Sequence, residues 1–290
     1  MESPNRVSID ERNDAITTDV TLQEAAEFLG VHYMTAYRYV RLGTLQAHKS
    51  GNVWRVRRDD LDMFRAAVPA AGVARPPAPW AERLESRLLA GDGGGAWGVI
   101  EAALASGGDP RSIYLDVITP AMVSIGERWE RGELDIAMEH RASGVASRIV
   151  GRLGPRFTRR GRTLGTVLVG APAGERHALP ISMVADLIRL EGYEVSDLGA
   201  DTPPASFAMA AAGLDRLVAV GISVTSPMNL GSARDTIVSL RGQLNNVPVM
   251  VGGNAVQSDD MRLDLGADLW VQDSAELPVY LAQAMAIARA

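Results

Sequence analysis

Short apolar runs alternate with helical patterns throughout the second half of the chain. Five such runs predict strands, at 165–171, 193–198, 217–223, 247–252 and 268–271. Amphipathic patterns fill the intervals, and the last one covers about 275–288. Five strand–helix units in series predict a parallel sheet with helices on both faces. The sequence therefore predicts a doubly wound α/β domain over residues 161–290.

Residues 80–160 have helical periodicity with few breaks. The pattern predicts helices at 80–90, 95–105, 110–131 and 134–153. The connections between these segments are short and contain glycine or proline. Four helices joined by short loops predict a four-helix bundle.

Residues 20–66 carry two short helical patterns, a tight turn and a third helix. Thr21 and Glu24 form a capping-box-like start for the first helix, and the second helix begins near Tyr33. Two short strands flank a turn at Gly51, and another helix follows. This order predicts a winged helix-turn-helix.

Composition limits the remaining segments and the available chemistry. Residues 1–19 are polar, so we expect a disordered leader rather than a signal peptide. The proline-rich segment 67–79 is expected to be a semi-rigid linker. The chain has no cysteine, which excludes thiol catalysis and Cys-ligated zinc and fits a cytoplasmic location. No apolar run reaches about 18 residues, so no membrane span is expected.

The net charge of −6 conceals a basic segment near the N-terminus. No Asp or Glu occurs between Phe28 and Arg58, although this stretch contains several arginines. A local basic patch in an acidic chain indicates a small nucleic-acid-binding module. The alternative is that these arginines only form a solvated face.

The order of elements in residues 20–66 resembles the winged helix-turn-helix of the MerR and excisionase families. The resemblance implies that the second helix enters the major groove of double-stranded DNA and that the wing contacts the flanking backbone. Arginine can bond guanine, whereas lysine and wing arginines neutralise phosphates. Tyr37 and Trp54 are expected in the core of this domain. The residues that match DNA-contacting positions are Thr35, Arg38, Tyr39, Arg41, Lys49, Arg55 and Arg57.

A histidine follows the first strand of the C-terminal domain. Glu175 and His177 lie in the loop at the carboxyl edge of the predicted sheet, where open α/β folds bind ligands. Imidazole suits a borderline transition metal, and the carboxylate can accept the other ring N–H. The alternative is a loop histidine without a ligand. No Gly-x-Gly-x-x-Gly or Walker A sequence follows the strand, so the usual nucleotide-binding motifs are missing.

This loop resembles the Asp/Glu-x-His-x-x-Gly loop of cobalamin-binding domains, which have a flavodoxin-like, Rossmann-like sheet. The later landmarks Ser223-Val224-Thr225 and Gly252-Gly253 occur in the family's order. The resemblance implies that His177 ligates cobalt from below. Small residues would also let the backbone approach a bulky planar ligand. Pro180 replaces the last glycine of the motif, and proline is tolerated in a first helical turn. The other residues assigned to the cofactor in this domain are Glu175, Ser223, Thr225, Gly252 and Gly253.

The spacing Trp129-x9-Glu139-His140 resembles the cap of light-responsive, cobalamin-dependent repressors of the CarH/LitR type. In that family a winged helix, a four-helix bundle and a cobalamin domain follow one another, and the resemblance covers about 20–290. It implies that Trp129 covers the upper face of adenosylcobalamin, with Glu139 and His140 beside it. It also implies a non-enzymatic repressor whose homotetramer binds operator DNA in the dark and falls apart when light cleaves the Co–C bond.

One departure from the family bears on the fate of the cobalt after light. Some members carry histidine directly after the cap tryptophan, whereas this chain has Glu130. Either His140 or water would then take the upper position, or the light response would be altered or absent. Other readings remain: a light-independent cobalamin or redox sensor, a sensor of another tetrapyrrole-derived pigment or small molecule, or a corrinoid carrier for methyl transfer. The winged helix argues against the carrier.

Overall fold

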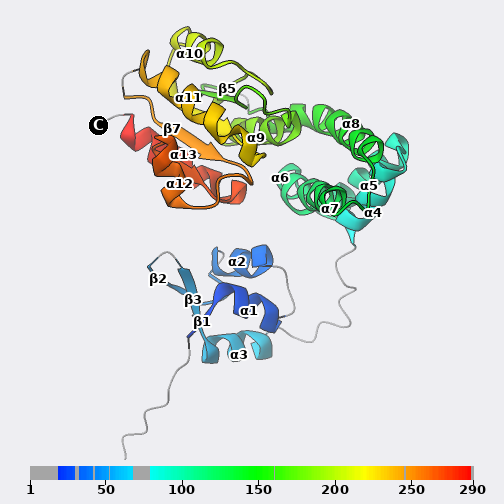
Figure 1. The fold of residues 1–290 in the computed structure, drawn as a ribbon. Coiled ribbons are helices and arrows are strands. Elements are labelled where there is room, and N and C mark those ends of the chain that lie inside the picture. Colours follow the sequence, from blue (N-terminus) through cyan, green and yellow to red (C-terminus); the bar gives the residue numbers. More distant parts are fainter. Residues whose placement is uncertain are drawn as a thin grey trace, which may run out of the picture. The chain divides into compact units, whose positions relative to one another are not determined.

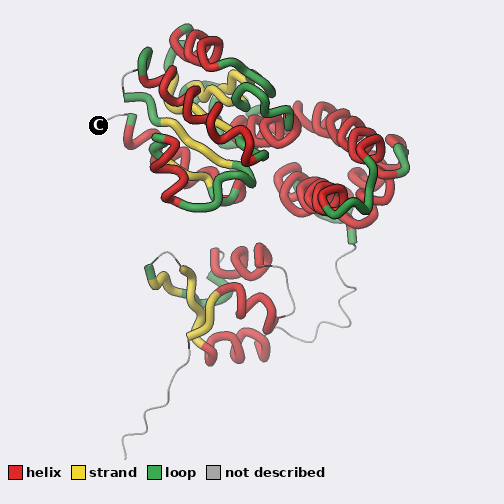
Figure 2. Tube along the Cα trace, viewed as in Figure 1, coloured by secondary structure: helices red, strands yellow, loops and turns green. Residues whose placement is uncertain are grey.

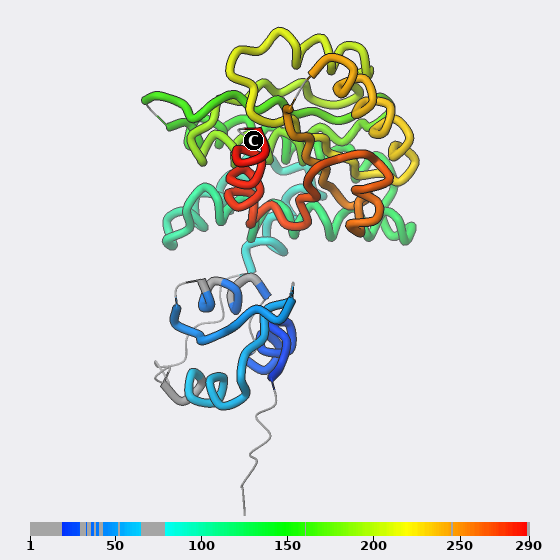
Figure 3. The backbone as a smooth tube through the Cα atoms, turned by 90° about the vertical axis from the view of Figure 1, so that its left-hand side faces the viewer, coloured from blue at the N-terminus to red at the C-terminus, as the bar shows by residue number. Residues whose placement is uncertain are grey.

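The computed structural model describes residues 19–29, 33–41, 43–51, 53–67, 79–159, 161–244 and 246–288. The chain divides into two compact units, residues 1–78 and 79–290. Figure 3 shows the chain from a second direction, with the smaller unit in blue. The expected leader and linker lie outside the described residues except at their ends, where residues 19, 67 and 79 are described.

The described residues of the smaller unit form three helices and a three-stranded antiparallel sheet in the order β1-β3-β2. The helices are α1 (Leu22–Leu29), α2 (Tyr33–Arg41) and α3 (Arg58–Ala67). The strands are β1 (Asp19–Thr21), β2 (His48–Ser50) and β3 (Val53–Arg57). The capping box is confirmed, because the backbone N–H of Thr21 donates to Glu24 at 2.7 Å and that of Glu24 donates to Thr21 at 3.2 Å.

Strand β1 corrects the sequence analysis, which placed Asp19 in a disordered leader. Asp19 pairs with Arg57 and Val20 with Val56, so β1 extends the wing sheet on its second edge. A strand of three residues carries too little alternation to stand out in a sequence.

The bundle consists of the four predicted helical segments. They are α4 (Trp80–Leu89), α5 (Gly93–Ala105), the continuous run α6–η1–α7 (Pro110–Ser112, Ile113–Ile118 and Thr119–Glu130), and α8 (Ile136–Leu153). A short 3-10 turn, η2 (Gly154–Phe157), ends the bundle. Figure 2 shows these helices in red.

The middle of the third bundle helix is π-helical, which the sequence analysis did not anticipate. The backbone N–H of Thr119 donates to the carbonyl of Tyr114, five residues back. Pro120 follows and has no N–H with which to close a regular turn onto residue 116. The missing donor therefore gives the chain a local reason to take the wider turn.

The sheet of the larger unit is parallel and has the order β5-β4-β6-β7-β8, which confirms a doubly wound domain. Its strands are β4 (Thr166–Gly170), β5 (Glu194–Asp197), β6 (Leu217–Ser223), β7 (Val249–Gly252) and β8 (Leu269–Val271). The helices are α9 (Ala178–Leu190), α10 (Pro204–Ala212), α11 (Leu230–Arg241), α12 (Asp259–Leu265) and α13 (Leu277–Ile287). Short turns η3 (Pro227–Asn229) and η4 (Ser274–Glu276) precede α11 and α13.

Helices cover both faces of this sheet (Figure 1). Val167 and Val169 of β4 face the layer that contains α9 and α13, and their core is continuous with that of the bundle. Leu168 faces the opposite layer, formed by α10, α11 and α12. The bundle and the sheet domain therefore share one apolar core. Within the described residues, no helix combines the length and apolarity needed to cross a bilayer.

Candidate cofactor site

The candidate site lies where the strand order of the sheet reverses. The first strand of the domain, β4, has β5 on one side and β6 on the other. The loops that leave the carboxyl ends of β4 and β6 therefore diverge and form a crevice. Open α/β sheets bind ligands at this switch point.

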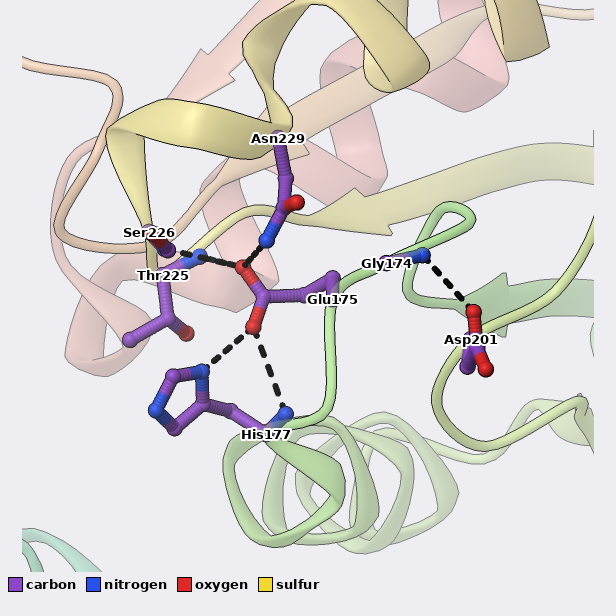
Figure 4. A network of polar contacts seen from close by, with 7 residues as sticks. All are labelled: Gly174, Glu175, His177, Asp201, Thr225, Ser226 and Asn229. Carbon is purple, nitrogen blue, oxygen red and sulfur yellow. Dashed lines mark hydrogen bonds and ion pairs between the residues drawn. The ribbon is translucent and has the colours of Figure 1, made fainter.

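The buried carboxylate of Glu175 joins these two loops (Figure 4). Its Oε2 accepts hydrogen bonds from the backbone N–H groups of Thr225 and Ser226, both at 2.8 Å, and from Nδ2 of Asn229 at 3.2 Å. Its Oε1 accepts from the backbone N–H of His177 at 3.3 Å and contacts Nδ1 of the same residue. Glu175 thus fixes the imidazole to the end of the neighbouring strand.

The state of Glu175 determines which ring nitrogen of His177 carries the proton. Burial alone would raise the pKa of the Glu175 carboxyl, but the donors from Ser226, His177, Asn229 and Thr225 outweigh it and hold the pKa below its usual value. An ionised carboxylate can only accept, so Nδ1 is the donor and the neutral ring keeps its lone pair on Nε2.

The Nε2 atom of His177 is open to a ligand. The side chain is 54% exposed, and the outer ring nitrogen points away from the Glu175 network in Figure 4. No residue in the described part of the chain forms a hydrogen bond with Nε2. A neutral imidazole oriented by a carboxylate is the arrangement found at metal-ligating histidines.

Local geometry explains how the loop presents His177. Gly174 has φ +84°, and its N–H donates to Asp201 at 2.7 Å, while Asp201 donates to the carbonyl of Glu175 at 2.8 Å. Helix α9 begins at Ala178, directly after His177. Pro180 lies in the first turn, where a backbone N–H has no helical acceptor, so the helix forms as expected.

The structure explains why residues 252 and 253 are glycines, and the explanation differs from the one inferred from the sequence. Gly253 has φ +98°, and a Cβ there would overlap the backbone carbonyl of Val224. A Cβ at Gly252 would lie 3.1 Å from the carbonyl oxygen of Val271. The close approach that requires these glycines is therefore made by the protein's own backbone. Ser223, which is buried, pairs with Gly252 in the sheet, so both lie at the carboxyl edge.

We expect Gly253→Ala to lower the free energy of unfolding by at least about 1–3 kcal/mol, because it combines a positive φ with a backbone clash. Gly199→Ala is the matched control, since Gly199 has φ +69° with open space around its Cα. Urea unfolding measures both variants. Equal losses would show that the Val224 contact adds nothing to the φ penalty.

We expect Glu175→Gln to remove part of the acid sensitivity of the fold. Because the folded pKa of Glu175 is depressed, its stabilisation is present above the unfolded value of about 4.5 and is lost as pH falls through the lower folded value. The variant should be less stable by about 1–3 kcal/mol at pH 7, since an amide N–H₂ would face backbone donors. Urea unfolding at pH 7 and pH 3.5 tests this, with the exposed Glu194→Gln as control. A variant as acid-sensitive as the parent would contradict the prediction.

The predicted cap residues lie on the bundle. Trp129, near the end of α7, is 44% exposed and therefore does not fill the bundle core. In the first turn of α8, Oε2 of Glu139 lies 2.6 Å from Nδ1 of His140, and Ser143 donates to Oε1 of Glu139 at 2.6 Å. Among the described residues, no hydrogen bond or ion pair joins these side chains to the His177 network.

The predicted DNA-contacting residues divide into three groups. The side chains of Thr35, Arg38 and Arg41 lie outside the described part of the structure. Arg55 and Arg57 share one face of β3, opposite the buried Val56, and Lys49 places Nζ 5.3 Å from the ring centre of Trp54. Tyr39 is partly buried and packs against the core, with its ring centre 5.0 Å from that of Phe64. Tyr37 and Trp54, which were expected in the core, are partly buried and pack against it.

Two residues of the His177 network were not found from the sequence. Ser226 contributes only its backbone N–H, which carries no sequence signal, and Asn229 acts from the η3 turn beyond the predicted landmark. Thr225 was predicted, but its backbone N–H is the group that contacts Glu175.

The donor set fits a metal that brings most of its own ligands. The described residues contain no group of three or more His, Cys, Asp or Glu side chains placed to hold an ion. A single oriented imidazole would supply one ligand to a metal that a macrocycle already holds. In such an arrangement, His177 would hold the cobalt of a corrinoid and Glu175 would fix the ring.

Family models match all three parts of the chain. A model described as a B12 binding domain matches residues 80–153, and another with the same description matches residues 165–281. A model described as a helix-turn-helix domain matches residues 20–67. The solved structure of the monomethylamine corrinoid protein of Methanosarcina barkeri has a TM-score of 0.63 over 70% of this chain and 98% of that chain. Because the two sequences are only 20% identical, this structural likeness shows a shared fold alone.

Two curated relatives differ in what they cover. Trimethylamine corrinoid protein 1 of Methanosarcina acetivorans is 28% identical over 183 residues, which are 62% of this chain and 84% of the relative. The HTH-type transcriptional repressor CarH of Myxococcus xanthus is 30% identical over 204 residues, 68% of this chain and 67% of the relative. Since the similarity to CarH extends over two thirds of both proteins, and all three domain models match, the chain belongs to the CarH family of cobalamin-binding helix-turn-helix regulators.

Proposed function

We propose that this protein is a light-responsive transcriptional repressor that uses adenosylcobalamin. The observation that carries the proposal is the Nε2 lone pair of His177, which the buried Glu175 directs out of the switch-point crevice. A winged helix-turn-helix on the same chain connects this cofactor site to DNA. The protein acts in the cytoplasm and catalyses no reaction of its own.

In this proposal each side chain has a distinct task. His177 holds the cobalt from below, and Glu175 keeps its ring in the tautomer that can do so. Trp129, an exposed indole at the end of α7, covers the upper ligand, with Glu139 and His140 beside it. When bound, adenosylcobalamin would supply a light-sensitive Co–C bond. Trp129 would then favour a bundle position over the site only while the cofactor offers it a contact.

The DNA side of the proposal depends on assembly. One winged helix offers few base contacts, whereas a homotetramer presents four such modules, and linked modules bind DNA far more tightly. We place Thr35, Arg38 and Arg41 of α2 toward the major groove and Lys49, Arg55 and Arg57 toward the flanking phosphates. Dissociation of the tetramer by light would then release the operator.

A corrinoid carrier for methyl transfer is the second candidate, because corrinoid proteins resemble the bundle and the sheet domain over most of their length. The helix-turn-helix model at residues 20–67 favours the regulator. Light-independent sensing of cobalamin or of another tetrapyrrole uses the same residues and differs only in its trigger.

Reconstitution with adenosylcobalamin in the dark tests the proposal. We expect the absorption spectrum of a protein-bound corrinoid and a larger assembly by light scattering, which green light reduces to smaller species. An unchanged mass after illumination would remove the light switch. Methyl transfer to or from the bound corrinoid with a partner methyltransferase would favour the carrier.

A further inference from the structure

A buried hydroxyl joins the bundle to the helix that begins beside His177. The side chain of Tyr114, in η1, is fully buried, and its hydroxyl donates to Oδ2 of Asp186 in α9 at 2.7 Å. The same hydroxyl lies 3.3 Å from the carbonyl oxygen of Val150 in α8. The ring of Phe157 packs on Tyr114 with ring centres 4.4 Å apart. One hydroxyl therefore lies where three helical segments meet.

The charge state of this contact is fixed. Burial raises the pKa of the Tyr114 phenol, and the neighbouring Asp186 carboxylate raises it further, so the proton stays on the tyrosine. The second oxygen of Asp186 accepts from Nη1 of Arg189 at 2.8 Å. Asp186 is buried, so removal of the tyrosine donor leaves a carboxylate oxygen without its partner inside the protein.

The π-helical segment determines where Tyr114 points. A π turn contains one residue more than an α-helical turn. Without that residue, the part of the helix before the turn would be rotated by about 100°, and Tyr114 would point away from α9. Arg111, in the preceding turn, contacts the same domain: it donates to Oε1 of Glu191 at 3.0 Å and to the carbonyl oxygen of Ala275 at 2.6 Å. The N-terminal end of the run Pro110–Glu130 is thus attached to the sheet domain, and the opposite end carries Trp129.

An open pocket lies beside the contact. It has a volume of about 610 Å³, lies between α8 and α9 and includes Asp186 in its lining. Its walls include small residues from both helices, such as Gly151, Gly154, Ala178 and Ser182. The polar contacts of Tyr114 and Arg111 therefore act beside this pocket, together with the apolar core that the bundle shares with the sheet domain.

We infer that Tyr114 and Asp186 form a positioning pair, which aligns the bundle helix that ends at Trp129 with the helix that starts beside His177. Trp129 lies about 22 Å along the helix from Tyr114, so a tilt of about 10° at the joint would move the indole by about 4 Å. A binding site tolerates displacements of only about 0.5 Å. The role assigned to this alignment rests on the proposed function, whereas the alignment itself does not.

Paired spin labels can test the alignment without any cofactor. The chain has no native cysteine, so Glu130→Cys and Arg176→Cys, both at exposed positions, give one pair of labels across the site. In the parent we expect one narrow distance distribution. Tyr114→Phe should broaden it by about twofold or more while the protein still unfolds cooperatively. A Tyr114→Phe distribution as narrow as that of the parent would overturn the inference.

Two further variants separate positioning from general stability. Phe157→Leu weakens the same core without touching the hydrogen bond, so it should lower the unfolding midpoint and leave the distribution narrow. Asp186→Asn keeps an acceptor for Tyr114 and should also remain narrow. Broadening in Phe157→Leu equal to that in Tyr114→Phe would reduce the pair to a structural contact and overturn the inference. A broader distance distribution in Asp186→Asn would assign the alignment to the ion pair with Arg189 and would also overturn the inference.

A cofactor measurement distinguishes this inference from the proposed function. In the label-free protein we expect Tyr114→Phe to weaken binding of adenosylcobalamin by about tenfold, with the spectrum of the bound corrinoid unchanged. If the parent binds no corrinoid, the proposed function fails, and the label distances still decide the alignment. If the parent binds and Tyr114→Phe binds equally tightly, the proposed function stands and the positioning pair does not.

Discussion

His177→Ala should abolish coordination of cobalt by the protein and weaken cobalamin binding by at least about 10–100-fold, the loss typical when even an outer-shell partner of a metal ligand is removed. The reason lies in the geometry of the crevice. Glu175 is buried, and in this variant its carboxylate would keep the four contacts that do not involve the imidazole. It therefore stays turned toward the protein and is poorly placed to replace the imidazole.

The absorption spectrum measures this prediction directly, since replacement of an imidazole nitrogen by water below the cobalt shifts the corrinoid bands. His48→Ala is the matched control. His48 is also half-exposed and lies 3.2 Å from a carboxylate, Asp19, but belongs to the smaller unit. A bound corrinoid with the parent spectrum and affinity in His177→Ala would show that the imidazole is no ligand. In His48→Ala, by contrast, we expect the parent spectrum and the parent affinity for cobalamin.

Most of the fold was predictable because each long element carries its own periodicity. The strands of the sheet were placed within about two residues, since buried parallel strands are short apolar runs bounded by turn residues. Their order, β5-β4-β6-β7-β8, is that of the flavodoxin-like sheet that the resemblance to cobalamin-binding domains implied. Strand β1 and the π-helical segment were missed for opposite reasons. The first is too short to carry a pattern, and the second keeps the apolar pattern of an α-helix while changing its hydrogen bonds.

The sequence predicted the central site residues, which act through their side chains, but could not predict the contacts that act through backbone groups. The pairing of Glu175 with His177 follows from their separation of two residues at the start of a helix. The donors of Thr225 and Ser226 arise from the path of another loop, and only the three-dimensional structure brings them to Glu175. The bond between Tyr114 and Asp186 joins residues 72 positions apart, and nothing local to either residue predicts it.

Green light should lower the affinity of the adenosylcobalamin-loaded protein for operator DNA by about 10²–10⁴-fold, the factor by which linked modules exceed single ones. In the proposed binding mode the smaller unit would reach DNA through several arginines and Lys49, so one copy should bind weakly, with an affinity that depends strongly on salt. Assembly adds no new base contact. It converts later binding events into intramolecular ones, and disassembly removes that gain without altering any winged helix.

The test uses a DNA duplex that the adenosylcobalamin-loaded protein selects from a random library in the dark. Fluorescence anisotropy then measures the affinity for this duplex before and after illumination. Arg55→Ala and Arg57→Ala act on the wing alone, so each should weaken binding and flatten its salt dependence in the dark and in the light. Because every linked module is weakened, dark binding should lose more affinity than binding after illumination. Equal affinities for DNA before and after illumination, despite cleavage of the Co–C bond, would show that cofactor chemistry and assembly are uncoupled in this chain. A light-independent cobalamin sensor would then be the better account.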